Sequence, residues 1–279
     1  MEKNRLASPV VKWVGGKRQI LDQIMKHVPK EVSTYYEPFL GGGAVLFELQ
    51  PRKAVVNDVN SELVNLYQVI RDNVEELIED LNRYKNEEEC FYRIRELDRD
   101  KEIYDSLTPT QRASRVIYLN KTCYNGLFRV NKAGEFNTPF GYYKNPNIVN
   151  DITLRAVSSY FNHAQITFTC QDFEEVVKKA RKGSFVYLDP PYDPVSDTAS
   201  FTGYDKGGFD RDEQIRLKKV CDKLNGKGIK FLLSNSATDF IKDLYREYKI
   251  EIIQAKRAIN SKGDRRGEID EVLVMNFEQ

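Results

Sequence analysis

The sequence has few residues of the kinds that build metal centres and disulfide frameworks. Its 279 residues include four cysteines and two histidines, His27 and His163. The cysteines are widely separated and include no CxxC pair, so we expect reduced thiols and no zinc site. Two histidines also leave little scope for a Ser-His-Asp triad.

A run of about 18 apolar residues is also missing, which argues against a transmembrane helix. The first residues, MEKNRLASPVVKW, contain no apolar signal-peptide region. We therefore expect a cytoplasmic protein with no membrane partner. The formal net charge is only +1, which argues against a general polyanion-coating protein but leaves local contact with nucleic acid open.

The two common phosphate-binding loops, Walker A and GxGxxG, are absent. Instead, Gly15-Gly16-Lys17 precedes an apolar helical pattern, and Gly41-Gly42-Gly43 follows an aromatic strand pattern. Asp58 ends a second short strand pattern. An acid at about this distance from a glycine loop binds ribose hydroxyls in dinucleotide folds, so the segment predicts an adenosine-bearing ligand. An NAD-linked oxidoreductase is a weaker alternative because GxGxxG is missing.

A buried strand pattern beginning at Ser184 ends in Asp189-Pro190-Pro191-Tyr192. The prolines have no N–H and cannot continue a ladder, so their carbonyl acceptors remain in a stiff loop beside an aromatic ring. Such a loop suits a planar group that carries an NH2. A plain proline turn, with Asp189 as a turn residue, accounts for these residues equally well when they are taken alone.

Residues 61–122 have helical apolar spacing and no strand pattern. We expect Ser61 to cap the first of these helices and Thr108-Pro109-Thr110-Gln111 to form a capping box at the last. The run interrupts an α/β alternation. It predicts a helical insert over 61–163, between α/β segments 1–60 and 164–279.

Aromatic, basic and amide side chains alternate over 124–144, around an expected hairpin turn at 131–134. That mixture suits contact with a DNA groove, and a hairpin with a packed aromatic face is the alternative. Five basic residues within 256–266 predict a loop that contacts phosphates, or otherwise a solvated surface loop.

Strand patterns resume at 165–169 and recur at 229–235, 250–255 and 271–277. Ligands of parallel α/β sheets bind at the carboxyl ends of strands, so the glycine loop, Asp58 and Asp189 can contact one ligand. The glycine loop has no obvious phosphate partner beyond Lys17, so an adenosine with a small charged tail fits better than a dinucleotide. S-adenosylmethionine is such a ligand, and its sulfonium favours nearby carboxylates. Such a ligand would place a methyl donor beside the expected amine socket.

Taken in order, these motifs resemble the Dam-like family of DNA adenine-N6 methyltransferases. The resemblance rests on Lys12-Trp13-x-Gly15-Gly16-Lys17, Glu37-Pro38-Phe39-x-Gly41-Gly42-Gly43, Asn57-Asp58-x-Asn60, Tyr124-Asn125-Gly126-Leu127-x-Arg129, Phe136-Asn137-x-Pro139-Phe140-Gly141, Asp189-Pro190-Pro191-Tyr192, Phe201-Thr202-x-Tyr204 and Ser234-Asn235. It implies a class I S-adenosylmethionine-dependent methyltransferase fold. In that fold a Rossmann-like α/β sheet carries an inserted, mainly helical target-recognition subdomain and a β-hairpin.

The resemblance also implies a role for each set of residues, with GATC as the target sequence. A flipped adenine would stack on Tyr192, while Asp189 and the Pro190 carbonyl accept its amino hydrogens. The expected cofactor contacts are Trp13, Lys17, Phe39, Gly41, Gly43, Asp58, Asp172, Phe173 and Asp189. The expected DNA contacts are Tyr124, Asn125, Leu127, Arg129, Pro139, Lys144 and Arg265, with Arg129 recognising a guanine.

The predicted activity is therefore site-specific adenine methylation of double-stranded DNA, without a metal. A cognate restriction endonuclease that acts on the same site is a partner that the resemblance allows. Three alternatives stay open: methylation of cytosine N4, methylation of a glutamine amide, and a non-enzymatic DNA-binding module. The basic and aromatic residues of 124–144 favour DNA over a protein amide.

Overall fold

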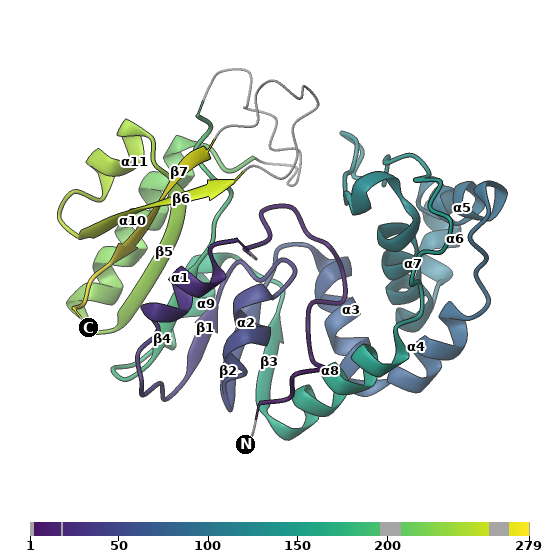
Figure 1. Cartoon of the computed structure of the whole chain (residues 1–279), viewed down its shortest axis with the longest axis horizontal. Coiled ribbons are helices and arrows are strands. Elements are labelled where there is room, and N and C mark those ends of the chain that lie inside the picture. Colours follow the sequence, from purple (N-terminus) through teal and green to yellow (C-terminus); the bar gives the residue numbers. More distant parts are fainter. Residues whose placement is uncertain (1–2, 18, 196–207, 257–267, 279) are drawn as a thin grey trace. The chain divides into compact units, whose positions relative to one another are not determined.

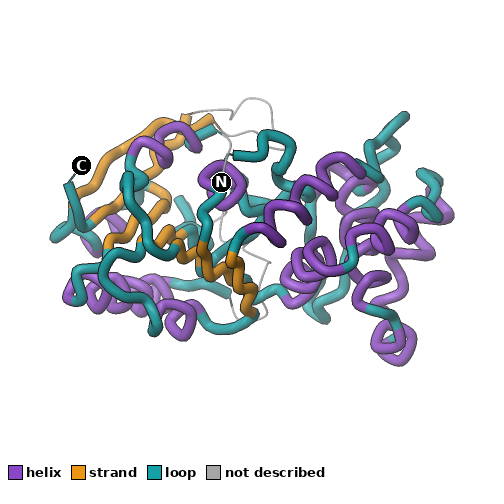
Figure 2. Tube along the Cα trace, turned by 90° about the horizontal axis from the view of Figure 1, so that it is seen from below, coloured by secondary structure: helices purple, strands orange, loops and turns teal. Residues whose placement is uncertain are grey.

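The computed structural model describes residues 3–17, 19–195, 208–256 and 268–278. Two predicted features therefore lie outside the described residues: the basic loop with Arg265, and the Phe201-Thr202-x-Tyr204 motif. Seven strands form one mixed sheet in the order β3-β2-β1-β4-β5-β7-β6 (Figures 1 and 2). An α/β sheet is what the sequence predicted.

The strands and helices have the following bounds. The strands are β1 Tyr35–Glu37, β2 Lys53–Asn57, β3 Gln165–Thr169, β4 Phe185–Leu188, β5 Lys230–Ser236, β6 Lys249–Lys256 and β7 Glu268–Met275. The helices are α1 Leu21–Lys26, α2 Ala44–Leu49, α3 Ser61–Asp72, α4 Val74–Leu81, α5 Glu88–Arg95, α6 Lys101–Ser106, α7 Pro109–Thr122, α8 Asp151–His163, α9 Phe173–Val177, α10 Arg211–Gly226 and α11 Asp239–Leu244, with short 3-10 helices η1 Glu96–Arg99 and η2 Tyr124–Gly126.

The chain divides into two compact units, which are described separately below. Unit 1 comprises Met1–Gly16, Gly41–Arg52 and Asp58–Cys170, and unit 2 comprises Lys17–Leu40, Lys53–Asn57 and Gln171–Gln279. The predicted division of the chain at residues 61 and 163 into a catalytic part and an insert stays a prediction.

In unit 2, strands β2, β1, β4 and β5 run parallel, and β7 pairs antiparallel with both β5 and β6. All four residues of β4 are buried, which explains why its sequence is apolar without alternation. One face of these strands packs against α9, α10 and α11 through side chains such as Leu188, Leu217 and Ile241. Tyr35 and Tyr187 alternate with residues of that face, so they point to the opposite one, where Figure 1 shows α1.

Unit 1 contains the predicted run of helices. Helix α3 packs against α7 and α8, and α4 also packs against α7 (Figure 1). Thr108 and Gln111 form the expected capping box at the start of α7. The prediction that Ser61 caps α3 was wrong by one residue. The cap is Asn60, whose side chain accepts hydrogen bonds from the N–H groups of Glu62 and Leu63, because an amide oxygen one position earlier reaches those donors.

The hairpin expected around 131–134 is present in reduced form. Its arms meet in one isolated antiparallel bridge, Val130 with Phe136, and a second bridge joins Cys123 to Phe140. The N–H of Asn131 donates to the Glu135 carbonyl, which closes the turn. Neither arm extends into a regular strand.

Among the described residues, no helix is long and apolar enough to cross a membrane.

The capping box of α7 predicts the effect of one substitution on stability. Thr108→Ala should lower the free energy of unfolding by about 1 kcal/mol, because the N–H of Gln111 loses its side-chain acceptor. Thr108→Ser keeps the hydroxyl and serves as the control. Urea unfolding followed by circular dichroism compares the two, and equal midpoints would show that the cap contributes nothing.

Candidate active site

Asp189 follows the last residue of β4, where the neighbouring strand β5 supplies Ser234. Because Leu188 pairs with Leu233, Ser234 lies level with Asp189 on the next strand, and its hydroxyl donates to Asp189 Oδ1 over 2.9 Å. The Tyr187 hydroxyl lies 3.0 Å from the same Ser234 oxygen. Lys17 Nζ forms an ion pair with Asp189 Oδ1 at 2.8 Å. The predicted acid is therefore held in place by both a hydroxyl and an ammonium group.

Burial sets the chemistry of this carboxyl. The Lys17 and Asp189 side chains are only 8% and 18% exposed, so neither charge is well solvated. Burial raises the pKa of Asp189, while Lys17 and the Ser234 hydroxyl act in the opposite direction. Lys17 thus favours the ionised carboxylate, which is the form that accepts hydrogen bonds on both oxygens.

Tyr192 is fixed at its hydroxyl and over its ring. The hydroxyl donates to Glu271 Oε2 on β7 over 2.9 Å. Lys17 Nζ lies 4.5 Å from the ring centroid, a cation–π distance. Glu271 was not predicted as a site residue, because no motif surrounds it and it lies 79 positions from Tyr192 in the chain.

The loop between Asp189 and Asp193 is held by buried polar side chains. Asn235 accepts a hydrogen bond from the N–H of Asp193 at 3.0 Å, and Gln214 donates to the Pro191 carbonyl at 2.8 Å. Asn235 and Gln214 also bond to each other at 3.1 Å, and both are almost completely buried. Pro190 and Pro191 therefore lie in a loop that is restricted both by the fixed φ angles of proline and by the hydrogen bonds of Asn235 and Gln214. Of these anchors, the sequence pattern pointed only to Asn235.

Three other predicted cofactor residues of unit 2 lie in or next to a cluster of aromatic rings. The Phe39 ring lies 5.4 Å from Phe173 and 5.7 Å, edge-on, from Phe209. Asp172 caps α9 through the N–H of Glu174 and forms a bidentate ion pair with Arg216 at 2.9 and 2.7 Å. The guanidinium of Arg216 holds the pKa of Asp172 below its ordinary value and lies 4.1 Å from the Phe173 ring centroid.

The glycine loop and Asp58 lie together in unit 1. Gly41 adopts a φ of +49°, and its N–H donates to Asp58 Oδ2 over 2.9 Å. The other carboxylate oxygen accepts from the N–H of Asn60 at 2.9 Å. Gly43, with a φ of +69°, stands at the start of α2. The predicted pairing of a glycine loop with a strand-end acid is thus present as a hydrogen-bonded turn.

Trp13 packs directly on this loop. A Cβ placed on Gly41 would come within 3.0 Å of Trp13 Cδ1, so a larger residue would have to displace the indole. On its other side Trp13 stacks on Phe128, with ring centroids 4.8 Å apart. Phe128 stands between the predicted DNA contacts Leu127 and Arg129, so one stack of two rings joins the glycine loop to that segment.

The predicted DNA contacts of unit 1 lie on loops that buried side chains hold in place. Asn120 accepts from the N–H of Lys12 and donates to the carbonyls of Lys12 and Gly126, all within 3.1 Å. Thr138 donates to the Leu127 carbonyl, and the N–H of Tyr124 donates to the Pro139 carbonyl. These bonds bring together two segments that the sequence had suggested separately.

The side chains on these loops are largely accessible. Tyr124, Asn125, Arg129, Pro139 and Lys144 are exposed, and Leu127 is partly exposed. Asn125 has a φ of +57°, a conformation that asparagine tolerates better than most residues. Arg129 Nε donates to Asn137 Oδ1 at 2.7 Å, which orients the guanidinium.

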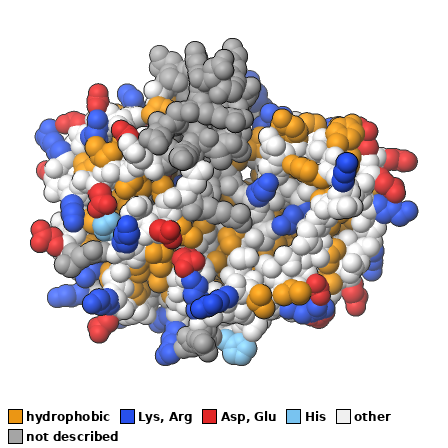
Figure 3. Space-filling model, viewed as in Figure 1, with side chains coloured by type: hydrophobic (Ala, Val, Ile, Leu, Met, Phe, Trp, Pro, Cys, Tyr) orange, Lys and Arg blue, Asp and Glu red, His pale blue; other side chains and the backbone are white. Residues whose placement is uncertain are grey.

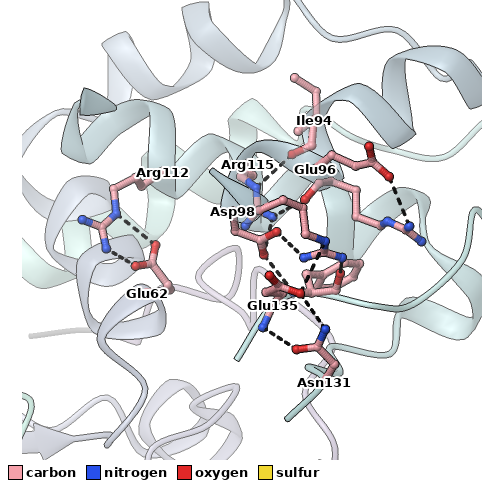
Figure 4. A network of polar contacts seen from close by, with 11 residues as sticks. Glu62, Ile94, Glu96, Asp98, Arg112, Arg115, Asn131 and Glu135 are labelled. Carbon is pink, nitrogen blue, oxygen red and sulfur yellow. Dashed lines mark hydrogen bonds and ion pairs between the residues drawn. The ribbon is translucent and has the colours of Figure 1, made fainter. Parts of the chain in front are cut away.

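A polar network ties this loop region to α7 (Figure 4). The buried Arg115 donates to the Ile94 and Arg95 carbonyls and forms an ion pair with Asp98 at 2.7 Å. Asp98 in turn accepts from the N–H of Phe136 at 2.8 Å. The ion pair of Arg115 and Asp98 therefore fixes the arm of the reduced hairpin to the helices. No sequence pattern predicted this pair.

Charged side chains of both signs are present on one face of the molecule. On the face shown in Figure 3, basic and acidic side chains are interspersed, in keeping with the net charge of +1. Within residues 3–17, 19–195, 208–256 and 268–278, no three His, Cys, Asp or Glu side chains gather in a way that could hold a metal ion.

Curated relatives match the chain over nearly its full length. A type II methyltransferase of Lactococcus lactis subsp. cremoris, M1.LlaDCHI, is 42% identical and covers 99% of this chain and 98% of its own. The type II methyltransferase M.MjaIII of Methanocaldococcus jannaschii is 44% identical, over 96% and 99%. The DNA adenine methylase of Escherichia coli K12 is 33% identical, over 99% and 96%.

The family comparison agrees with these relatives. Residues 13–259 match the family described as D12 class N6 adenine-specific DNA methyltransferase. The matched range begins at Trp13 and includes the glycine loop, the Tyr124–Arg129 segment and the Asp189–Tyr192 loop described above. The resemblance seen in the sequence is thereby confirmed, and the chain belongs to the D12 class of N6 adenine-specific DNA methyltransferases.

Proposed function

We propose that this enzyme transfers a methyl group from S-adenosylmethionine to the exocyclic N6 of an adenine that is flipped out of duplex DNA, within the sequence GATC. The observation that carries the proposal is the largely buried Asp189 side chain at the end of β4, held by Lys17 and Ser234 beside the Tyr192 ring. The adenine specificity of the family favours this substrate over cytosine N4 or a glutamine amide.

The residues that would hold S-adenosylmethionine suit that ligand. In unit 1, the Gly41 turn and Asp58 form the kind of glycine-and-acid pair that binds an adenosine ribose, and Trp13 covers the turn. In unit 2, Phe39 and Phe173 offer aromatic surface and Lys17 a cation for a carboxylate. Gly43, Asp172 and Asp189 are further proposed contacts of S-adenosylmethionine. When bound, the cofactor supplies the methyl group.

The protein's own groups would prepare the adenine amino group. Tyr192 would stack on the base once it has left the helix, a step that costs a few kcal/mol. Asp189 and the Pro190 carbonyl would accept the two amino hydrogens, which makes the nitrogen lone pair available. Because the loop is anchored by Asn235 and Gln214, these acceptors are oriented before the substrate arrives. The excess proton can leave after the transfer.

The exposed loops of unit 1 would recognise the DNA. Arg129, oriented by Asn137, suits the acceptor pair on the major-groove edge of a guanine. Tyr124, Asn125, Leu127, Pro139 and Lys144 are the further proposed contacts, together with Arg265 outside the described residues. The enzyme would act in the bacterial cytoplasm or nucleoid. Two relatives are named type II methyltransferases, which supports a cognate restriction endonuclease as a partner.

Removing the carboxylate tests the assigned chemistry. Asp189→Ala should lower single-turnover methylation of duplex DNA by more than a hundredfold, because both the acceptor for the amino group and the partner of Lys17 are lost. Equilibrium DNA binding should largely survive. The fully exposed Asp239, changed to Asn, is the control. Methylation by Asp189→Ala at more than a few per cent of the wild-type rate would rule out the role.

Removing the guanidinium of Arg129 tests recognition. Arg129→Ala should reduce the preference for GATC over sites with one guanine replaced by roughly five- to a hundredfold, the usual range for one bidentate base contact. Arg155, an exposed arginine on α8 of the same unit, is changed to Ala as the control for lost charge. If discrimination is unchanged, Arg129 does not recognise a base.

The target sequence is tested in cells. DNA from a host without its own adenine methylation, expressing this protein, should resist a nuclease that is blocked by adenine methylation at GATC. It should also become sensitive to a nuclease that requires that methylation. The Asp189→Ala protein gives the negative control. Methylated adenine in DNA that is still cut at GATC by the first nuclease would place the target in another sequence.

A further inference from the structure

We propose that Glu271 is a positioning residue for methyl transfer, and that it acts by fixing the ring of Tyr192 on which the target adenine would stack. This inference rests on the proposed function. No motif of the sequence points to Glu271, whose Oε2 accepts a hydrogen bond from the Tyr192 hydroxyl at 2.9 Å.

The hydrogen bond constrains the one part of Tyr192 that the backbone does not control. The anchored loop fixes where the residue begins, through the Pro191 carbonyl and the N–H of Asp193. Rotation about the side-chain torsions could still swing the ring. A carboxylate bound to the hydroxyl at the far end of the side chain restricts that swing, and Lys17 over the face of the ring limits its rotation about the Cβ–Cγ bond.

Glu271 itself is well placed to act as an anchor. It belongs to β7, which is paired on both sides: Glu271 lies opposite Ser236 of β5 and opposite Ile253 of β6. A residue in the interior of a sheet moves less than one in a loop. The hydrogen bond therefore fixes the position of Tyr192 relative to the sheet of unit 2.

The negative charge of Glu271 would strengthen its hydrogen bond to the Tyr192 hydroxyl. A glutamine could accept the same bond without the cost of burying a carboxylate. Burial indeed raises the pKa of Glu271, as does the nearby Asp189, whereas Lys17 and the Tyr192 hydroxyl lower it. An ionised acceptor makes a shorter and stronger hydrogen bond to a phenol. Lys17 thus interacts with Asp189, with Glu271 and with the Tyr192 ring. Of the two acids, Glu271 is the one that accepts the hydrogen bond of the Tyr192 hydroxyl.

Substitutions at Glu271 separate positioning from binding. Glu271→Leu should lower the single-turnover rate on duplex DNA by about tenfold or more, as expected for losing a charge-assisted hydrogen bond. Its dissociation constants for DNA and for S-adenosylmethionine should stay within about threefold of wild type. Glu271→Gln, which retains an acceptor, should recover part of the rate. Asp270→Asn changes the exposed neighbour on the same strand and is the matched control.

A readout without methyl transfer follows the ring itself. In duplex DNA with 5-iodouracil in place of the target adenine, photo-crosslinking to Tyr192 depends on stacking between base and ring. Glu271→Leu should reduce the crosslink to Tyr192 several-fold, whereas Asp270→Asn should not. An undiminished crosslink would overturn the inference.

Epistasis with Tyr192→Phe identifies the route of the effect. Tyr192→Phe keeps the ring and removes the hydroxyl, so the double variant with Glu271→Leu should be no slower than Tyr192→Phe alone. Additive losses in rate would overturn the inference by showing that Glu271 acts elsewhere. If Glu271→Leu fails to fold, Glu271→Gln takes its place in the same cycle. If the wild-type protein itself methylates no DNA, it is the proposed function that fails.

Discussion

The ion pair between Lys17 and Asp189 is the interaction on which the proposed active site depends. Both side chains are largely buried, and a buried ion pair generally stabilises a fold little, if at all, relative to apolar residues of the same volume. Its presence at the end of β4 is better explained by chemistry than by stability. The lysine favours the ionised form of the acid and also lies over the Tyr192 ring, so one cation contacts both the proposed acceptor and the ring on which the base is proposed to stack.

The same design recurs in both units: reactive or exposed side chains stand on loops, and buried amides or charged groups hold those loops. Asn235 and Gln214 hold the loop that follows Asp189. Asn120 of α7 forms two hydrogen bonds with Lys12 and one with Gly126 of the segment that follows α7, and Arg115 with Asp98 holds the hairpin arm. Buried polar groups are costly unless their hydrogen bonds are satisfied, and once satisfied they specify one geometry. Rigid loops are what the orientation of an amino group requires.

Local patterns predicted much of this arrangement. The α/β alternation, the helical run over 61–122 and the capping box at Thr108 are each encoded within a few residues. The Gly41–Gly43 loop and the Asp189–Tyr192 loop were also visible because each is a short motif, and Asp58 was visible because it ends a strand pattern 17 residues after Gly41. Glu271 could not be found in this way, since its role depends on the antiparallel pairing of β7 with β5. Asn60 in place of Ser61 as a cap shows a smaller limit: two good capping residues in succession leave the sequence ambiguous by one position.

The central claim is that the group held between Asp189, the Pro190 carbonyl and Tyr192 is the amino group of adenine. Its most direct test is to identify the product. Duplex DNA treated with the protein and S-adenosylmethionine carrying a labelled methyl group is digested to nucleosides and analysed by mass spectrometry. The label should appear in N6-methyldeoxyadenosine and be absent after treatment with Asp189→Ala. Label in N4-methyldeoxycytidine, or no label in any nucleoside, would contradict the account.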